Sequence, residues 1–433
     1  MCSSSGRYAD LSNSRRFSRK GTLFALQPTL FRGSKCFSSL ESGQLEGMHE
    51  LKHNRTRHVH AYLTINVVPC SNLSRLLHRR SSCLSIFTHF LTILSFKMSP
   101  IEILVLLLSV HALASPFVRR SAPAFAFDGD APFTVDSDTL ASSLTCPYGN
   151  PTSSSPPVLL VHGTATTGAE SWGDGYVPAL KANGYTACYV TIPNRSMGDM
   201  QINAEYVAYN LHYIATLSGG LQTAVIAHSQ GNPNTQWALQ FWPSTRNVTR
   251  AFVALSADFS GIDVLGSDTL FHDICESGVC QAALWQQAAG SEYYKALHAA
   301  NFKSQVPTTS IWTQFDGVVA PFSENAQLPG ATVLSVQNLC PLRPTTHVTM
   351  TISSAAYALA LDALDNGGIA NLSRVKRNAF GICLRVTAKG MRVSIASDLQ
   401  NSLVELVDGF LLATPMLKSE PTLAPYAQQQ VVD

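Results

Sequence analysis

The sequence predicts an α/β fold in which a mainly parallel sheet carries helices on both faces. Strand-like apolar runs alternate with helical segments from about residue 142 onwards, and this alternation is typical of parallel sheets. One of these runs, 223–227, ends at a small-x-Ser-x-small turn that leads directly into a helical segment. In addition, 45% of the 433 residues are hydrophobic and 13% are charged, so the chain can bury a large core.

The expected elements follow in chain order. The strands are short, apolar and partly β-branched, and we place them at 157–162, 186–192, 223–227, 250–255, 308–313 and 332–336. The expected helices lie between and after them, at 172–183, 201–217, 232–242 and 353–364. The first is ended by Gly184, and the second places Val207, Leu211 and Ile214 on one face at helical spacing.

A processing signal divides the chain. Residues 1–97 contain 14 Lys and Arg against 4 Asp and Glu, whereas 98–433 contain 16 against 24. Met98 is followed by an apolar run, 103–110, and by Ala-Leu-Ala ending at Ala114, which is the layout of a secretory signal peptide and its cleavage site. The expected segments are a leader (1–97), a signal peptide (98–114), an N-terminal or pro segment (115–141) and one main domain (142–433).

This division predicts a secreted, extracellular protein. The leader is interpreted as an upstream extension of the gene model, and a transit-like, disordered extension of an organellar protein is the alternative. The apolar run is too short to cross a membrane, so we expect no transmembrane span in the mature chain. The mildly acidic body gives no support to a role with nucleic acids. Arg119-Arg120 is either a dibasic processing site or a solvated pair, and the sequence does not decide.

Cysteine usage agrees with secretion. The main domain contains six cysteines, which suggests three disulfides, although spacing alone leaves the pairing open. They are Cys146, Cys188, Cys275, Cys280, Cys340 and Cys383. Cys275 and Cys280 flank four residues and can close a local loop, and because no second cysteine pair or histidine motif accompanies them, we expect no metal site. Asn194, Asn247 and Asn371 begin glycosylation sequons.

Ser229 is the candidate nucleophile. It lies in Ala227-His-Ser-Gln-Gly231, between the strand 223–227 and the helix 232–242. Strand, tight turn and helix form a nucleophile elbow, in which the serine sits in a strained turn and the residues two before and two after it must be small. Alanine and glycine meet this need, although the first position departs from the usual glycine. The alternative is an ordinary serine at a strand-to-helix turn.

The partners of this serine are sought further along the chain. A serine hydroxyl becomes a good nucleophile when a neutral imidazole takes its proton, and a carboxylate must hold that imidazole in the right tautomer. On this fold the partners follow in the order serine, acid, histidine, at the carboxyl ends of strands. Asp316 follows the strand 308–313, and Asp258 is the competing acid. His347, the last histidine, is the candidate base, with a surface histidine as the alternative.

Two backbone segments are candidates for the oxyanion hole, which needs preorganised donors. Gln230 offers its N–H directly after the serine, and Thr164 offers its N–H and its hydroxyl in the loop after the first strand, where Gly163 permits close approach. This loop has the glycine spacing of a phosphate loop but lacks the required Lys-Ser/Thr, so no nucleotide site is expected. His162 and His228 lie too near their strand ends to act as bases, and we expect them to line the site.

Six sequence blocks agree, in order, with one known family. They are PVLLVHGTATTG (157–168), QINAEY (201–206), HSQG (228–231), LWQQAAGS (284–291), QVPTTS (305–310) and EPTLAPYA (420–427). These blocks resemble the fungal family of Candida antarctica lipase B, within the α/β-hydrolase superfamily. The resemblance implies the α/β-hydrolase fold, a catalytic triad of Ser229, Asp316 and His347, and an oxyanion hole formed by Thr164 and Gln230.

The same resemblance implies two disulfides, Cys146–Cys188 and Cys340–Cys383. Cys275–Cys280 would then be a local addition. The family's third disulfide, near the C-terminus, is expected to be absent because Ser419 occupies its first position.

The resemblance also assigns residues of the substrate pocket. Asp258 is expected as a buried polar residue near the pocket, with Gln287 as its hydrogen-bond partner. His228 replaces the aromatic residue that floors the family's alcohol-side pocket, so we expect a wider and more polar pocket. Val318 is expected to line the substrate pocket. The Gly-rich stretch 256–284 is the candidate lid, with a static crossover as the alternative.

These observations predict a serine hydrolase that cleaves carboxylic esters of lipids through an acyl-enzyme. We expect a lipid or small ester as substrate, with a lipid–water interface as one setting, and a monomeric enzyme that needs neither metal nor cofactor. A carboxylesterase or acyltransferase for short or specialised esters is the alternative among enzymes. A non-catalytic binding module on the same fold is the alternative outside them.

Overall fold

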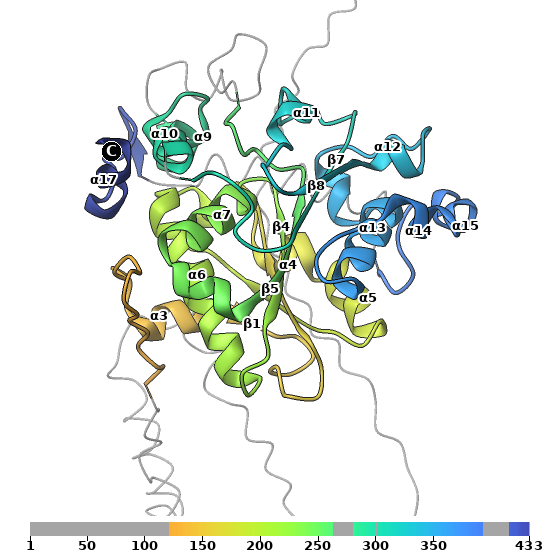
Figure 1. Cartoon of the computed structure of the whole chain (residues 1–433), viewed down its shortest axis with the longest axis horizontal. Helices are drawn as coiled ribbons and strands as arrows, with labels where there is room; N and C mark the ends of the chain where they lie inside the picture. Colours follow the sequence, from red (N-terminus) through yellow and green to blue (C-terminus); the bar gives the residue numbers. More distant parts are fainter. Residues whose placement is uncertain (1–120, 263–279, 300, 393–414, 433) are drawn as a thin grey trace, which may run out of the picture. The chain divides into compact units, whose positions relative to one another are not determined.

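The structure, a computed structural model, describes residues 121–262, 280–299, 301–392 and 415–432 (Figure 1). All of them belong to one compact unit, Ala114–Asp433. The predicted leader and signal peptide lie outside the described residues, as do the first residues of the N-terminal segment and the middle of the candidate lid, 263–279. No helix among the described residues is long and apolar enough to cross a membrane.

A seven-stranded sheet forms the centre of this unit, with the strand order β1-β3-β2-β4-β5-β7-β8. The strands are β1 (Leu144–Thr145), β2 (Pro157–Val161), β3 (Thr186–Val190), β4 (Thr223–His228), β5 (Thr249–Leu255), β7 (Thr308–Trp312) and β8 (Thr332–Ser335). Only β1 is antiparallel to its neighbour, and the other neighbouring pairs are parallel. The sheet is therefore the mainly parallel sheet that the sequence predicts, and each predicted strand is present.

Helices connect and cover these strands. The longer helices are α6 (Met200–Leu217), α7 (Gly231–Phe241), α10 (Glu292–Ala299), α13 (Ser354–Asp365) and α17 (Pro425–Val432). The shorter ones are α3 (Ser137–Ser142), α4 (Gly168–Trp172), α5 (Tyr176–Ala182), α9 (Ala282–Gln287), α11 (Phe322–Asn325), α12 (Val336–Leu339), α14 (Leu372–Lys376) and α15 (Ala379–Cys383). The described residues also form the 3-10 helices η2 (Pro193–Ser196), η3 (Pro243–Val248) and η4 (Val348–Thr351), and a small second sheet pairs β6 (Cys280–Gln281) with β9 (Met416–Leu417).

The sheet separates two apolar cores, because successive side chains of a strand point to opposite faces. On β4, Val225 and Ala227 pack with α6 and α7, whereas Ala224 and Ile226 pack with α5 and α13. Figure 1 shows the same division, with α6 and α7 on one side of the sheet and α5 and α13 on the other. Burial on both faces explains why the strands are continuously apolar rather than alternating.

One predicted helix was wrong. The sequence favoured a single helix over 172–183, but the chain forms α4 and α5 with a break at Gly173–Gly175. Gly175 has φ −93° and ψ −99°, which is not helical, and a Cβ there would lie 2.8 Å from the carbonyl oxygen of Thr351. The close approach of a distant loop, which a local pattern does not reveal, therefore fixes this break.

Two disulfides are present in the described part of the chain. Cys146–Cys188 joins β3 to the segment that follows β1, and Cys340–Cys383 joins the end of α12 to α15. These are the two pairs that the family resemblance implies. The third predicted pair includes Cys275, which lies outside the described residues.

Candidate active site

Ser229 occupies a strained turn between β4 and α7. Its φ is +53°, in the left-handed region that non-glycine residues seldom adopt. Its N–H donates to the carbonyl oxygen of Leu255 at 3.0 Å, and its own carbonyl oxygen accepts from the N–H and the side-chain amide of Asn232, at 2.9 and 2.8 Å. A Cβ at Gly231 would lie 2.7 Å from the carbonyl oxygen of Val161, so the turn requires glycine there. The backbone therefore fixes the position of Ser229.

Asp316 and His347 form a buried pair. Asp316 follows β7, and its Oδ2 accepts from Nδ1 of His347 at 2.9 Å. Its other oxygen, Oδ1, accepts from the N–H groups of Val318 and Val319, at 3.1 and 2.9 Å. Both residues are 7% exposed. Every contact fixes the carboxylate in the orientation that holds the imidazole with its proton on Nδ1.

The pKa values of the pair diverge. Burial opposes the ionised form of Asp316, but the positive His347 and the hydrogen bonds to the carboxylate prevail and lower its pKa to about 2. Burial likewise lowers the pKa of His347, yet the attraction of Asp316 outweighs burial and raises the pKa above its usual 6.5. The pair thus stabilises a positive charge on His347, which is what a base that takes a proton needs.

His228 holds His347 from the side of β4. Nε2 of His228 donates to the backbone carbonyl oxygen of His347 at 2.9 Å, and the two rings lie 4.7 Å apart between centroids. Burial and the neighbouring His347 lower the pKa of His228 to about 3, so its ring is neutral in ordinary buffers. A further bond, from the Thr313 hydroxyl to the carbonyl oxygen of Thr345, fixes the loop just before His347. The residue before the candidate nucleophile thus supports the candidate base.

The loop after β2 lies directly against Ser229. A Cβ at Gly163 would lie 2.8 Å from Cβ and 3.3 Å from Oγ of Ser229, so the two residues are in contact. The backbone N–H groups of Thr164 and Gln230 donate to no acceptor within the described residues. Gln230 is also the N-cap of α7, where unpaired N–H groups and the helix dipole favour negative charge. Two free donors therefore lie on the segments that flank Ser229.

Several contacts hold the conformation of this loop. Ala165 has φ +60°, and its carbonyl oxygen accepts from Nε of Arg195 at 2.8 Å. The same guanidinium forms an ion pair with Glu170 at 2.6 Å, and Glu170 and Thr167 form a reciprocal capping box at the start of α4. His162 is fully buried; its ring nitrogens bond to two backbone groups, at 2.9 and 3.0 Å, and to the Thr166 hydroxyl at 3.5 Å, so it supports the loop rather than lining the site.

The predicted bond between Asp258 and Gln287 is absent. Gln287 instead accepts from the Thr164 hydroxyl at 2.9 Å and donates to the carbonyl oxygen of Ala283 at 3.1 Å. The carboxyl of Asp258 is contacted by the Tyr294 hydroxyl, 3.3 Å from Oδ2. Complete burial raises the pKa of Asp258 to about 7. Gln287 is therefore tied to the loop after β2, and Asp258 is buried in the core.

The remaining predicted residues have the following places. Val318 is partly buried and packs on a small apolar cluster that includes Val319 and Leu284. The hydroxyl of Ser229 makes no hydrogen bond to the His347 ring, a contact that in unliganded hydrolases often tightens only with substrate. Among the described residues, no three His, Cys, Asp or Glu lie close enough together to hold a metal ion.

Two supporting residues were not predicted from sequence. Asn232 fixes the carbonyl oxygens of Ser229 and Leu255, and Tyr294 contacts Asp258. The position of Asn232, three residues after the serine, was a usable signal because it lies in the first turn of the helix. Nothing in the sequence pointed to Tyr294, whose contact spans 36 residues.

Comparison with known proteins places these features in context. No protein-family model matches the chain. Lipase B of Pseudozyma antarctica is 29% identical over 335 residues, which is 74% of this chain and 92% of that protein. The crystal structure of Aspergillus fumigatus lipase B is similar with a TM-score of 0.65 and 30% identity, covering 71% of this chain and 76% of that one.

Proposed function

Because the chain belongs to the lipase B family of α/β-hydrolases and is a carboxylic ester hydrolase, we propose that it is a secreted serine lipase in which Ser229, Asp316 and His347 act as the catalytic triad. The observation that carries the proposal is the buried bond between Nδ1 of His347 and Asp316, with His347 held by the residue that precedes Ser229.

In the first half of the reaction, Oγ of Ser229 attacks the ester carbonyl carbon while Nε2 of His347 takes the hydroxyl proton. Asp316 remains ionised and stabilises the imidazolium of His347. The lowered pKa of Asp316 and the raised pKa of His347 agree with these roles. The imidazolium then gives its proton to the leaving alcohol oxygen, the ester C–O bond breaks, and an acyl-enzyme forms on Ser229.

In the second half, a water molecule takes the place of the alcohol. His347 removes a proton from the water, its oxygen attacks the acyl carbon, and the proton passes to Oγ of Ser229 as the carboxylic acid leaves. The oxyanion of each tetrahedral intermediate is bound by the N–H groups of Thr164 and Gln230, which are free in the resting enzyme. Gln287 keeps Thr164 in place through its hydroxyl.

The substrates of the proposed enzyme are esters of fatty acids, triacylglycerols among them. Support comes from the similarity to the two lipases B. Two disulfides in the described residues support secretion. Asn194, Asn247 and Asn371 are exposed and are the proposed glycan sites.

Hydrolysis of a short and a long soluble ester, p-nitrophenyl butyrate and p-nitrophenyl palmitate, and of emulsified tributyrin tests the proposal. The purified protein is compared with Ser229→Ala and with Ser373→Ala, an exposed serine on α14, as the matched control. We expect Ser229→Ala to lose all three activities and Ser373→Ala to keep them. Turnover of butyrate alone would indicate an esterase. An unimpaired Ser229→Ala would remove Ser229 from the mechanism.

A further inference from the structure

Three large apolar side chains around α15 are exposed to solvent. Leu342 is 95% exposed, Phe380 82% and Leu384 69%, the highest values of any large hydrophobic residue in the described part of the chain. None of the residues of α15 is buried, although its sequence, AFGIC, is apolar. Exposed apolar side chains that lie close together are typical of surfaces that bind another protein or a membrane.

The backbone that carries these three side chains is fixed by a disulfide and by hydrogen bonds. The Cys340–Cys383 disulfide fixes α15 to the turn that carries Leu342. The guanidinium of Arg343 bonds to the carbonyl oxygens of Cys383 and Arg385. Oγ of Ser354, in the first turn of α13, lies 2.8 Å from the carbonyl oxygen of Ile382. The disulfide and these hydrogen bonds therefore hold the backbone that carries the three apolar side chains in one place.

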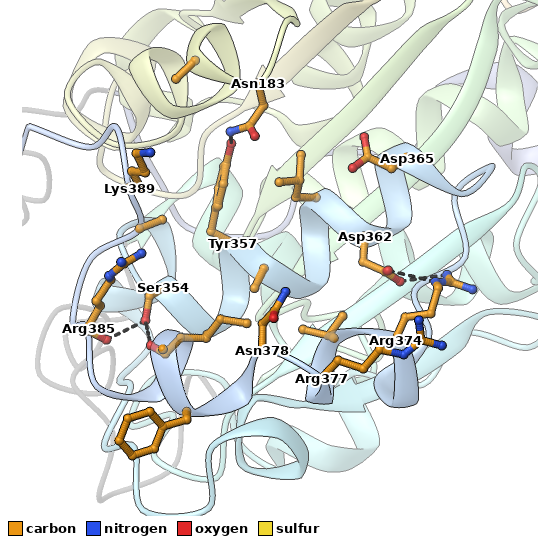
Figure 2. Close-up of a pocket in the computed structure, with 18 residues that line it drawn as sticks. Asn183, Ser354, Tyr357, Asp362, Asp365, Arg374, Arg377, Asn378, Arg385 and Lys389 are labelled. Atoms are coloured by element: carbon orange, nitrogen blue, oxygen red, sulfur yellow. Dashed lines mark hydrogen bonds and ion pairs between the residues drawn. The ribbon is translucent and has the colours of Figure 1, made fainter.

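A basic cleft adjoins the apolar side chains. Its volume is about 830 Å³, and it lies between α13, α14, α15 and the end of α5 (Figure 2). Arg385 and Lys389 lie on one side of it and Arg377 on the other, as Figure 2 shows. None of these three has an ion-pair partner among the described residues, whereas the neighbouring Arg374 is paired with Asp362 at 2.8 Å. Asp365 also lines the cleft and forms no ion pair within this part of the chain, so three unpaired cations stand against one unpaired carboxylate, and the cleft is basic on balance.

The charge of this region is opposite to that of the remaining body. Residues 340–392 contain seven Lys and Arg against two Asp and Glu, whereas the whole of 98–433 contains 16 against 24. The segment that carries the apolar side chains is thus basic, whereas subtraction leaves 9 Lys and Arg against 22 Asp and Glu for the rest of 98–433. Such a charge distribution orients the protein at a negatively charged surface and repels it in other orientations.

We propose that the α15 surface, defined as Leu342, Phe380 and Leu384 with Arg377, Arg385 and Lys389, docks on an anionic lipid surface. The apolar side chains enter the interfacial layer, and the cations contact the lipid phosphates and carboxylates. A second copy of the chain fits poorly, because a symmetric contact would bring the same positive charges together. Docking does not depend on Ser229, so it stands apart from the proposed catalytic function.

Sedimentation with vesicles tests the proposal. The full chain carrying Ser229→Ala, which cannot degrade lipid by the proposed mechanism, is mixed with vesicles of phosphatidylcholine alone and of phosphatidylcholine with phosphatidylserine in equal parts. We expect binding to the mixed vesicles that weakens as salt is added, and much weaker binding to phosphatidylcholine alone.

Two triple variants separate a specific surface from general charge. Arg377→Gln, Arg385→Gln and Lys389→Gln together should lower binding to the mixed vesicles about 100-fold, since each basic residue contributes about fivefold. The matched control, Lys295→Gln, Lys303→Gln and Lys418→Gln, removes the same charge from exposed lysines elsewhere and should leave binding within about twofold. Replacing Leu342, Phe380 and Leu384 by Ser should lower binding to both kinds of vesicle.

Equal binding by the two charge variants, or no binding by the parent, would overturn the proposal. A concentration-dependent dimer that disappears with the three serine substitutions would assign the surface to a second copy instead. Hydrolysis of p-nitrophenyl butyrate by the same variants on the Ser229 background verifies that they fold. If the Ser229→Ala chain binds vesicles but the chain with Ser229 intact cleaves no ester, the proposed catalytic function fails and the docking surface stands.

Discussion

Asp316→Asn tests the role of the carboxylate without changing its shape. The amide oxygen can still accept the two N–H bonds from Val318 and Val319. The amide nitrogen must then face Nδ1 of His347, where the acceptor Oδ2 now lies 2.9 Å away. Two donors cannot face one another, so the imidazole is driven to the tautomer with its proton on Nε2. In that form His347 cannot accept the proton of Ser229.

The expected loss is large in rate and moderate in stability. Where the acid of such a triad is replaced by its amide, kcat falls by about 10⁴ because of the wrong tautomer. The difference between the ordinary pKa of 3.8 and the value of about 2 in Asp316 corresponds to about 2 kcal/mol of folding free energy. Because this pKa is lowered, the contribution is complete above pH 3.8 and is lost as the pH falls towards about 2.

Asp316→Asn is compared with the parent and with Asp258→Asn. For each protein, kcat/KM for p-nitrophenyl butyrate and the free energy of unfolding in urea are measured at pH 8. Asp258 forms no hydrogen bond with His347 and attracts it only electrostatically, and complete burial raises the pKa of Asp258 to about 7. A raised carboxyl pKa destabilises the fold as the pH rises from about 4 to about 7, so Asp258→Asn should gain stability over that range relative to the parent. It should keep kcat/KM within about tenfold of the parent. An active Asp316→Asn beside an inactive Asp258→Asn would refute the assignment.

Three further predictions concern the same site. Because His347 must be neutral to accept a proton and its pKa is raised, kcat/KM should fall on acidification with a midpoint above pH 6.5, and a midpoint below 6 would contradict the His347–Asp316 pairing. His228→Phe keeps a ring beside His347 but removes the 2.9 Å bond to the carbonyl oxygen of His347, which then keeps only the 3.4 Å bond from the N–H of Met350; kcat should fall about tenfold with little change in KM. Since His228 is neutral above about pH 4, the acidic midpoint should not disappear in this variant, and its disappearance would make His228 the base. Gly163→Ala places a methyl group 3.3 Å from Oγ of Ser229 and should lower kcat/KM about 10²-fold. The control Gly381→Ala meets no atom within 4 Å and should not lower kcat/KM. Equal activities of the two variants would mean that the loop after β2 moves to accommodate the methyl group.

The fold was predictable because its strands are buried on both faces. Continuous apolar runs such as Val158–Val161 and Ala224–Ala227 have few other uses, and the turn after the latter requires small residues on both sides of Ser229. The break near Gly175 was not predictable, since the loop around Thr351 that causes it is distant in sequence. Local patterns thus indicate which segments are strands and helices, but not which distant backbone interrupts them.

The candidate site was predictable in part. Chain order pointed to Asp316 and His347 but left Asp258 as a competitor, because both acids follow a strand. What separates them is the direction of the side chain, towards His347 in one case and towards Tyr294 in the other. The contact of His228 with His347 spans 119 residues, and it arises from how the residue before η4 packs against the end of β4. The resemblance to a family supplied the preference for Asp316, but a local pattern could not.

The backbone conformation at Ser229 lowers the free energy of unfolding at the residue on which the proposed activity depends. A non-glycine residue with φ +53° costs about 1–2 kcal/mol, and glycine would relieve that cost. The fold therefore holds the proposed nucleophile in a conformation that the chain would otherwise avoid. Selection of variants for heat resistance alone would favour Gly at this position and would enrich inactive proteins. Any programme of thermal improvement for this chain must therefore score turnover in the same round as melting.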